Sequence, residues 1–339
     1  MRAPSFWDAP ERPWQVTALA PLGLAYDALT RLRFSMARPY RSTLPVVCVG
    51  NLVAGGAGKT PTALALGELA RARGLTPAFL SRGYGGAEAG PLAVDPVRHD
   101  AKAVGDEPLL LARVAPTIVS RGRPAGARLA EQIGADIIVM DDGLQNPSLA
   151  KTVSFALVDA ETGIGNGRVI PAGPLRADVD FQFRLIDALI LVGGGRAGDA
   201  VAARAGRRAI PVFRATMSGH NVGGLAGRRV VAFAGIARPE KFFASLVALG
   251  ANLVARRGFA DHHPFLEREA KELLAIAARE NALLVSTEKD LARLKGREGA
   301  LGRLAEATRP LLVSLIFDDP EELVDFLRKK GALEKRSNR

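Results

Sequence analysis

The spacing of hydrophobic positions changes along this chain near residue 44. Before that point, within 14–41, apolar residues recur at helical intervals. Beyond it, short and almost uninterrupted apolar runs alternate with longer amphipathic stretches. Strands that are buried on both faces are apolar in this continuous way, and amphipathic helices between them cover a parallel sheet. The pattern predicts an α/β fold in which a mainly parallel sheet carries helices on both faces.

The apolar runs also divide the chain into parts. Those of the first half are LPVVCVGN (44–51), TPAFLSR (76–82), PTIVS (116–120), ADIIVMDD (135–142), TVSFALVDA (152–160) and DALILVGG (187–194). The pattern then loosens into a stretch rich in glycine and arginine, and a second alternating series begins at residue 228. We predict a helical segment over 1–43, a main α/β domain over 44–192, a linker over 193–227 and a second, smaller α/β domain over 228–339.

Charge narrows the choice of partners. The 339 residues carry a formal net charge of +11, which favours anionic partners such as nucleic acid, acidic lipid headgroups or phosphorylated substrates. Aromatic residues make up only 6% of the chain and form no motif with basic residues for stacking on bases, so nucleic acid is not an expected partner. The single cysteine, Cys48, lies in an apolar run, and this excludes a disulfide framework and a cysteine zinc site.

The segment 14–41 combines helical spacing with nearby tryptophans and a set of arginines. Pro21, Gly23 and Asp27 interrupt it too much for a membrane span. Two interpretations stay open: an interfacial helix that rests on an anionic membrane, or a helix packed on its own domain. The acids and prolines in the first residues do not fit a cleavable signal peptide, which predicts a cytoplasmic location.

A glycine-rich turn lies between a strand and a helix in VGNLVAGGAGKTPTALALGELA (49–70). Glycines at this turn let backbone N–H groups converge on phosphate oxygens, while Lys59 can reach the terminal phosphates and Thr60 can offer its hydroxyl to magnesium. Val53 stands where the usual phosphate loop has its first glycine. Because the strand before and the helix after are the context that the motif needs, the stretch predicts a site for ATP and Mg²⁺.

A phosphate loop needs a magnesium carboxylate at the end of a nearby strand. Asp141 and Asp142 directly follow the apolar part of 135–142, so they emerge at the carboxyl edge of the sheet, where open α/β sheets bind ligands. Two acids after a strand can also cap a helix or a turn. Together with the loop, they favour a metal site.

Two further groups have both a structural and a chemical interpretation. Asp106, in GDEP, precedes a proline and an apolar helix and would be a good helix cap; it could also orient or deprotonate a hydroxyl that attacks a phosphate. The local sequence alone favours the cap. His262 and His263, in GFADHHPF, are either part of a solvated loop or include a catalytic histidine paired with an acid of the other domain.

Arginines also occur in glycine-rich loops at expected strand ends. Such arginines suit a polyanionic ligand, although any one of them can be a solvated charge. The candidates for binding substrate are Arg82, Arg123, Arg168 and Arg176.

Taken in order, eight motifs of this chain resemble the tetraacyldisaccharide 4'-kinase family of lipid A biosynthesis. They are VGNLVAGGAGKTP, SRGYGG, GDEP, DDGLQN, GNGRVIPAGPLR, AGIARPEKFF, DHHPF and STEKD. The resemblance implies a P-loop NTPase-like fold and an ATP-dependent kinase, peripheral on the cytoplasmic face of the bacterial inner membrane. It further implies that the acceptor is the 4'-hydroxyl of an acylated glucosamine disaccharide 1-phosphate, that lipid IVA is the product, and that an amino-terminal helix enters the anionic membrane surface.

The resemblance also implies roles for individual residues. ATP would be held by Val53, Ala54, Gly55, Gly56, Ala57, Gly58, Lys59 and Thr60. Mg²⁺ would be held by Thr60, Asp141, Asp142 and Gln145. Asp106 would be the catalytic base, in place of a mere cap, and His262 would pair with it from the second domain; Lys59 would complete the catalytic set. Where the family usually has D-D-G-F-Q-H and a glutamate after GPLR, this chain has Leu144, Asn146 and Ala177, so any role of that glutamate is in doubt here.

One other class of protein remains as an alternative. Membrane-associated ATPases of the partitioning kind also pack glycines before the loop lysine, and they use ATP as a switch without phosphorylating a small substrate. They carry an extra lysine early in the loop, where this chain has Val53 and Ala54. The kinase is therefore the favoured interpretation.

Overall fold

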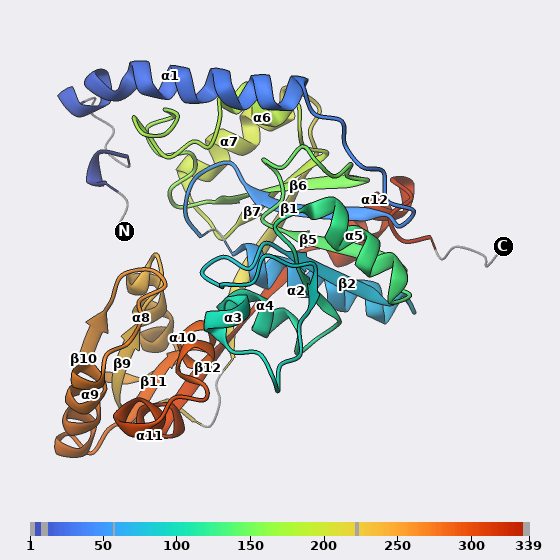
Figure 1. Ribbon diagram of the computed structural model, residues 1–339. Coiled ribbons are helices and arrows are strands. Elements are labelled where there is room, and N and C mark those ends of the chain that lie inside the picture. The colour runs from blue at the N-terminus through green and yellow to red at the C-terminus, as the bar shows by residue number, and fades with distance from the viewer. Residues whose placement is uncertain (1–3, 8–12, 57, 221–223, 335–339) are drawn as a thin grey trace.

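The computed structural model describes residues 4–7, 13–56, 58–220 and 224–334 (Figure 1). The strands are β1 (Val46–Asn51), β2 (Pro77–Ser81), β3 (Leu92–Ala93), β4 (Thr117–Val119), β5 (Ile137–Asp141), β6 (Val153–Asp159), β7 (Ala188–Val192), β8 (Val212–His220), β9 (Arg229–Ala234), β10 (Asn252–Gly258), β11 (Leu283–Thr287) and β12 (Thr308–Phe317). They form one sheet in the order β10-β9-β11-β12-β8-β7-β6-β1-β5-β2-β4-β3. All neighbouring pairs are parallel except β3 with β4 and β8 with β12.

Helices cover the sheet on both faces. They are η1 (Ser5–Trp7), α1 (Trp14–Ser35), α2 (Lys59–Ala72), α3 (Ala101–Val104), α4 (Asp106–Leu111), α5 (Arg123–Gln132), α6 (Val179–Phe183), α7 (Arg196–Gly206), α8 (Pro239–Ala248), α9 (Glu267–Arg279), α10 (Glu288–Leu294), α11 (Gly299–Ala307) and α12 (Pro320–Lys329). The expected α/β architecture and the strands predicted in the first half are confirmed.

The central strand β1 shows why these segments form a doubly covered sheet. Successive side chains of a strand point to opposite faces. Val47 and Val49 pack into a core that includes Leu66 of α2, whereas Val46 and Cys48 pack into a second core that includes Ala127 of α5. Every residue of β1 is buried, and this explains the continuous apolar run in the sequence.

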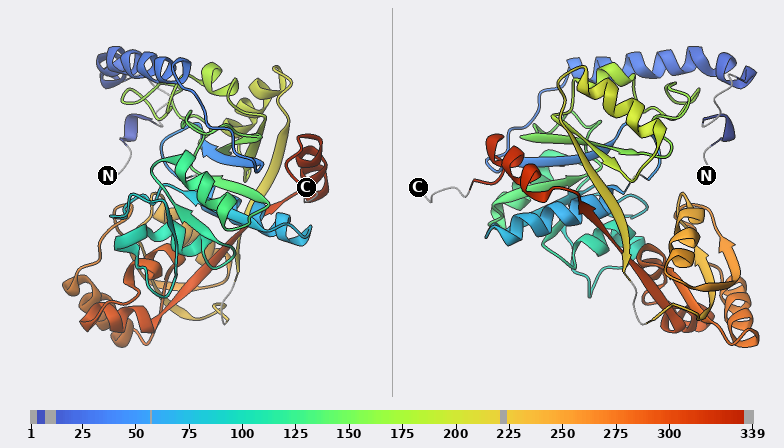
Figure 2. Two further views of the ribbon diagram at one scale, coloured as in Figure 1. Left: turned by 45° about the vertical axis from the view of Figure 1, so that its right-hand side comes forward. Right: turned by 180° about the vertical axis from the view of Figure 1, so that it is seen from behind.

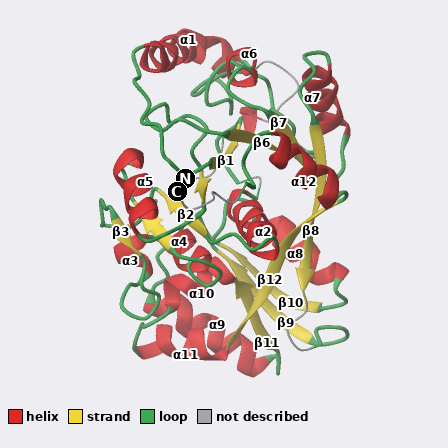
Figure 3. Cartoon of the chain, turned by 90° about the vertical axis from the view of Figure 1, so that its right-hand side faces the viewer, coloured by secondary structure: helices red, strands yellow, loops and turns green. Residues whose placement is uncertain are grey.

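The stretch 193–227, expected to be a linker, contains α7 and β8. β8 pairs in parallel with β7, with Leu189 opposite Val212, and antiparallel with β12, with Ala215 opposite Phe317. In Figure 2, β8 and β12 run together from the upper to the lower half of the molecule, and Figure 3 shows the same two long strands between the halves. The helix α12 that follows β12 returns to the first half, where Leu323 joins the core beneath β1.

The second half of the chain builds its own two cores around β9. Val231 and Phe233 pack with residues of α9 and α11, whereas Val230 and Ala232 pack with residues of α8. This unit lies at the lower left of Figure 1 and meets the first half near α3 and α4. The contact between α10 and α4 brings loops of the two halves to one place.

The long helix α1 lies along the top of the molecule in Figure 1. The Oδ1 atom of Asp27, on its inner face, accepts a hydrogen bond from the backbone N–H of Asp178 at 2.7 Å, and its Oδ2 atom accepts one from Arg31 at 2.6 Å. The outer positions include Trp14 and Leu24, which are 75% and 73% exposed. Helix α1 is thus packed on the domain by one side and apolar on the other. Among the described residues, no helix is long and apolar enough to cross a membrane.

Candidate active site

The glycine-rich turn connects the end of β1 to the first residue of α2, Lys59. Gly55 and Gly58 have φ values of 117° and 87°, which lie in the left-handed region that favours glycine. The side-chain amide of Asn51 donates to the carbonyl of Gly55 at 2.6 Å and closes the turn. A Cβ atom at Gly55 or Gly56 would meet no heavy atom within 4 Å, so the space above the turn is open. Ala57 lies outside the described residues.

Asp141 and Thr60 meet below this turn. β5 is the parallel neighbour of β1, with Val49 opposite Asp141, and the Thr60 hydroxyl donates to Asp141 Oδ2 at 3.2 Å. Both side chains are buried, and the Oδ1 atom of Asp141 accepts no hydrogen bond within the described part of the chain. Burial, together with the charge of Glu107, raises the pKa of Asp141 to about 7. A cation beside Oδ1 would supply the missing partner and favour the ionised carboxylate.

The Thr60–Asp141 pair fits a magnesium site that is completed by phosphate. The described residues contain no cluster of three or more His, Cys, Asp or Glu side chains that could hold a metal alone. Mg²⁺, however, is usually bound by one or two carboxylates, water and the phosphates of its substrate. The Thr60 hydroxyl and the buried Asp141 carboxylate supply oxygen ligands for the ion. The open glycine turn leaves room for the phosphates that would supply the others.

Asp142 and Gln145 are held by Arg176. Arg176 donates to Asp142 Oδ1 at 2.7 Å and to Gln145 Oε1 at 3.1 Å, and Lys59 Nζ lies 3.8 Å from Asp142 Oδ2. Burial alone would raise the pKa of Asp142, but Lys59 and Arg176 outweigh it and the pKa lies below its usual range. The two neighbouring aspartates therefore differ: Asp142 already has cationic partners, and Asp141 has an open oxygen.

Asp106 lies between the two halves of the molecule. It is the first residue of α4, whose cap is Gly105, so the interpretation of Asp106 as a helix cap is wrong. Its side chain is 3% exposed, and His262 Nδ1 lies 3.3 Å from its Oδ2 atom. The ring of Tyr84 lies 5.1 Å from the ring of His262. An acid of the first half and a histidine of the second are thus in contact.

Two basic residues of α10 complete this junction, and sequence reasoning assigned neither of them a role. Arg293 Nε lies 3.1 Å from Asp106 Oδ2, and Lys289 donates to Glu107 at 2.6 Å. Lys289 and Arg293 are four residues apart and therefore lie on one face of α10. That spacing within STEKDLARL was the available signal, but only the docking of α10 against α4 identifies what the two side chains meet.

These contacts shift the pKa values of the pair in opposite directions. Burial would raise the pKa of Asp106, but the His262 ring, 3.3 Å away, and the charges of Lys289 and Arg293 hold it below its usual range. The pKa of His262 is raised, chiefly by its contact with the Asp106 carboxylate. The carboxylate is therefore kept ionised, and the imidazole can carry a proton beside it.

The four candidate arginines occupy different environments. Arg176 lies in the site, as described above, whereas Arg82 and Arg168 are exposed. Arg123 is only 2% exposed and donates to the carbonyls of Ser120 and Asp141. In this structure Arg123 thus contacts the backbone at the end of β5. Ala177, in place of the family's glutamate, is buried, and its carbonyl accepts a hydrogen bond from Gln182.

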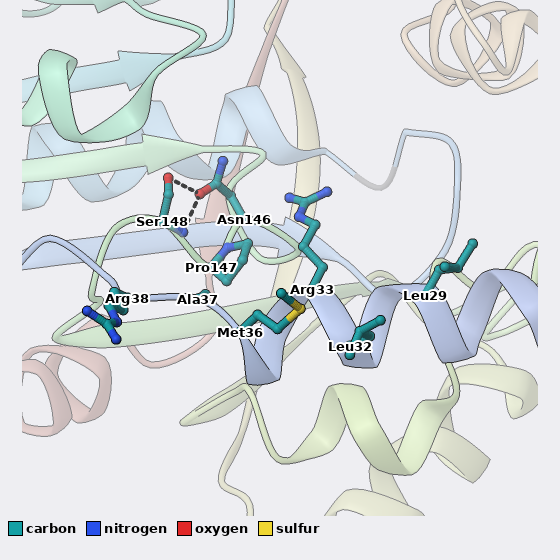
Figure 4. A pocket seen from close by; sticks show the side chains of 9 residues that line it. All are labelled: Leu29, Leu32, Arg33, Met36, Ala37, Arg38, Asn146, Pro147 and Ser148. Atoms are coloured by element: carbon teal, nitrogen blue, oxygen red, sulfur yellow. Dashed lines mark hydrogen bonds between the residues drawn. The ribbon is translucent and has the colours of Figure 1, made fainter.

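A groove of about 530 Å³ lies beside the site, between the end of α1 and the loop 146–148 (Figure 4). It is lined by Leu29, Leu32, Arg33, Met36, Ala37, Arg38, Asn146, Pro147 and Ser148. Arg33 donates to the carbonyl of Gln145 at 3.1 Å. The groove thus joins apolar and basic residues of α1 to the loop that follows Asp142.

Known proteins share both the sequence and the fold of this chain. The family described as tetraacyldisaccharide-1-P 4'-kinase matches residues 15–332. A tetraacyldisaccharide 4'-kinase of Methylorubrum extorquens (strain PA1) is 57% identical over 302 residues, which cover 89% of this chain and 92% of the relative. One of Methylobacterium radiotolerans is 53% identical over 335 residues, which cover 98% of this chain and 99% of the relative.

A solved structure supports the fold. The structure of LpxK from Aquifex aeolicus in complex with ATP superposes with a TM-score of 0.72 at 24% sequence identity, and the match covers 93% of this chain and 99% of that one. Relatives at this identity and coverage, together with the family match over most of the chain, show the family. This chain belongs to the tetraacyldisaccharide 4'-kinase family.

Proposed function

We propose that this protein transfers the γ-phosphate of ATP to the 4'-hydroxyl of tetraacyldisaccharide 1-phosphate, which yields lipid IVA. One observation carries the proposal: in a chain of this family, an open glycine turn adjoins the buried Asp141 carboxylate, one of whose oxygens meets the Thr60 hydroxyl while the other has no hydrogen-bond partner in the described part of the chain. Phosphoryl transfer depends on positioning and charge neutralisation more than on covalent help from the protein. The site supplies both of these.

The residues at the turn would hold the nucleotide. The backbone of 53–56 and 58 and the start of α2 would face the phosphates, and Lys59 would exchange its contact with Asp142 for the terminal phosphates. Thr60 and Asp141 would hold Mg²⁺, whose charge would neutralise the phosphate oxygens. Asp142 and Gln145 would stay beside this ion through Arg176.

The Asp106–His262 pair would take up the proton of the attacking hydroxyl. The Asp106 carboxylate is kept ionised by its neighbours, and a group that accepts a proton must be available in that form. In this structure Asp106 is almost fully buried and the His262 side chain is the more exposed member. We therefore treat the two side chains as one acid–base unit that draws on both halves of the molecule.

The acceptor would reach the site from an anionic membrane surface. The outer side of α1 exposes large apolar side chains, and the groove shown in Figure 4 is lined by Arg33 of its last turn and by Arg38 of the segment that follows it. The exposed Arg82 and Arg168 are candidates for the acceptor's phosphate. The exposed apolar side of α1 and the lipid substrate support a peripheral position on the cytoplasmic face of the inner membrane as part of this proposal.

A direct assay tests the proposal. Purified protein is incubated with ATP, Mg²⁺ and tetraacyldisaccharide 1-phosphate in detergent, and the lipid is analysed by mass spectrometry. We expect a product that is heavier by one phosphate, and we expect Asp141→Asn to form it much more slowly. A rate of ATP hydrolysis that did not depend on the lipid and rose with self-association would instead indicate the partitioning type of ATPase. That result would overturn the proposal.

A further inference from the structure

The guanidinium of Arg293 contacts Asp106 directly and reaches His262 only through the backbone next to it. Its Nε atom lies 3.1 Å from the Oδ2 atom of Asp106, the same oxygen that faces His262. Its Nη2 atom donates to the carbonyl of Gly235 at 2.8 Å, and that carbonyl also accepts from the backbone N–H of His262 at 3.1 Å. Its Nη1 atom donates to the carbonyl of His263 at 3.2 Å. Arg293 therefore binds the carbonyl that accepts from the His262 N–H and the carbonyl of the next residue, His263.

His262 needs such support because its backbone is in a rarely populated conformation. Its φ is 55°, in the left-handed region, where a residue other than glycine costs roughly 1 kcal/mol or more and persists only when its surroundings fix it. The hydrogen bond to Gly235 and the neighbouring carbonyl of His263 are the fixed points of this turn. Arg293 holds both, and its side chain is only 11% exposed.

The rest of the environment explains why the guanidinium keeps one orientation. Asp290 lies 3.1 Å from Nη2, and the carbonyl of Lys289 accepts from Nε. A Cβ atom at Gly235 would come within 3.1 Å of Arg293 Nη1, so glycine leaves the space that the guanidinium fills. A planar group with several donors can meet a carboxylate and two carbonyls together, which a lysine ammonium cannot do in the same geometry.

We propose that Arg293 is the positioning residue of the Asp106–His262 pair: it fixes the turn that presents His262 and anchors the Asp106 carboxylate of the other half against it. This inference rests on the proposed function, because it assigns Arg293 a role through the pair and not through the substrate. The inference also assigns a role to the motif STEKD and the residues after it, because α10 begins within this motif and places Arg293 at the junction of the two halves.

One other cross-domain contact of α10, the ion pair of Glu288 with Arg113, does not reach the Asp106–His262 pair. Arg113 of the first half donates to Glu288 at 2.9 Å, but its side chain is 52% exposed and it touches neither member of the pair. Arg113→Ala therefore removes an ion pair between the same two helical regions and leaves the pair intact. It is the matched control for a general weakening of the junction.

The test compares lipid kinase rates of the full-length protein and its variants at saturating Mg²⁺. We expect Arg293→Ala and Arg293→Lys to lower kcat by roughly 10- to 100-fold, since misplacing a reacting group by about 1 Å costs on the order of 100-fold. The KM for ATP should change by no more than about twofold, because the phosphate loop is untouched, and Arg113→Ala should keep kcat within about twofold. The lysine variant retains the charge and serves if the alanine variant does not fold.

Combination with His262→Ala separates positioning from a merely structural role. If Arg293 acts through the pair, then Arg293→Lys added to His262→Ala should slow the enzyme by no more than about twofold beyond His262→Ala alone. Losses that multiply in the double variant, or a normal kcat in Arg293→Lys, would overturn the inference. A normal kcat in His262→Ala would instead refute the proposed role of the pair, so the two failures are distinguishable.

Discussion

Asp141 and Asp142 are neighbours in the chain, yet their surroundings move their pKa values in opposite directions. Asp141 ends β5 in the buried sheet, where one oxygen has only the Thr60 hydroxyl and the other has no partner within the described residues. Asp142 turns away with a φ of 51° and meets Arg176 and Lys59. The change in backbone direction between these two aspartates therefore gives their carboxylates different partners and different pKa values.

At the same scale, Asp106 should be needed for turnover and not for nucleotide binding. Asp106 contacts residues of the second half and no residue of the phosphate loop in the structure's described contacts. We expect Asp106→Asn to lower kcat by roughly 100- to 10,000-fold, the range for general base catalysis, and to leave ATP affinity within about twofold. Enzyme assays and calorimetric titration with ATP measure the two effects.

Asp100→Asn is the matched control, because Asp100 caps the preceding helix α3 and an asparagine can also cap. It should leave both the rate and the ATP affinity close to normal. A joint loss of ATP binding and rate in Asp106→Asn would indicate that Asp106 has a structural role.

At the scale of elements, α2 carries the phosphate loop and its position depends on close packing against β2. Gly67 lies on the buried side of α2, and a Cβ atom there would come within 2.4 Å of Cζ of Phe79. Phe79 is fully buried in the core beneath β1. The distance between α2 and the sheet, and with it the place of Lys59 and Thr60, is therefore set partly by the absence of a side chain.

Gly67→Ala should destabilise the fold although alanine favours helices. We expect a loss of about 1–3 kcal/mol in the free energy of unfolding, the usual cost of overpacking a core. Gly206→Ala is the control: Gly206 is in α7, and a Cβ atom there would meet nothing within 4 Å, so that variant should be neutral or slightly more stable. Denaturant titrations compare the two; equal effects would contradict the packing argument.

The exposed apolar side of α1 leads to a second prediction at this scale, which concerns membrane binding. Leu24 and Leu29 are 73% and 66% exposed on α1, and replacing both with glutamate removes apolar area and adds negative charge. We expect Leu24→Glu/Leu29→Glu to lose most of its binding to anionic vesicles in a sedimentation assay and to keep its folding stability. Val247→Glu, at an exposed apolar position of α8, should bind normally; if it lost binding equally, α1 would not be the membrane contact.

At the scale of the whole molecule, one sheet continues through both halves, yet the site depends on side-chain contacts between them. The ribbon of β8 and β12 joins the halves through the backbone, and Arg238 and Lys241 of the second half reach Asp159 at the end of β6. The Asp106–His262 contact is a third connection. The last connection includes a histidine, whose ordinary pKa lies near neutral pH.

The contribution of His262 to stability should therefore depend on pH. The pKa of His262 is raised in the folded protein, so its contribution is fully present below the unfolded value of about 6.5 and is lost as pH rises through the folded pKa. Asp106 stays ionised across this range because its pKa is lowered. We expect His262→Ala to reduce the unfolding free energy more at about pH 6 than at about pH 9. A difference that grew with pH would contradict the assigned partner.

The sequence predicted most strands of the sheet because the patterns that indicate a strand extend over only a few neighbouring residues. The continuous apolar runs at β1 and β5 and the glycine turn before Lys59 are patterns within a few residues, and they identified the strands, the phosphate loop and Asp141. The expected linker was different: β8 is held by pairing with β7 and β12, so its strand character depends on partners distant in sequence more than on its own residues.

What the sequence by itself determined is the α/β class, the phosphate loop and, through its ordered motifs, the family. Only the tertiary structure decided that Arg123 lies buried at the end of β5, that Arg176 holds Asp142, and that Arg293 meets Asp106 and the turn at His262. The physical reason is that hydrophobic periodicity and turn chemistry act between near neighbours, whereas a charged side chain acquires its partner only when distant segments are packed together.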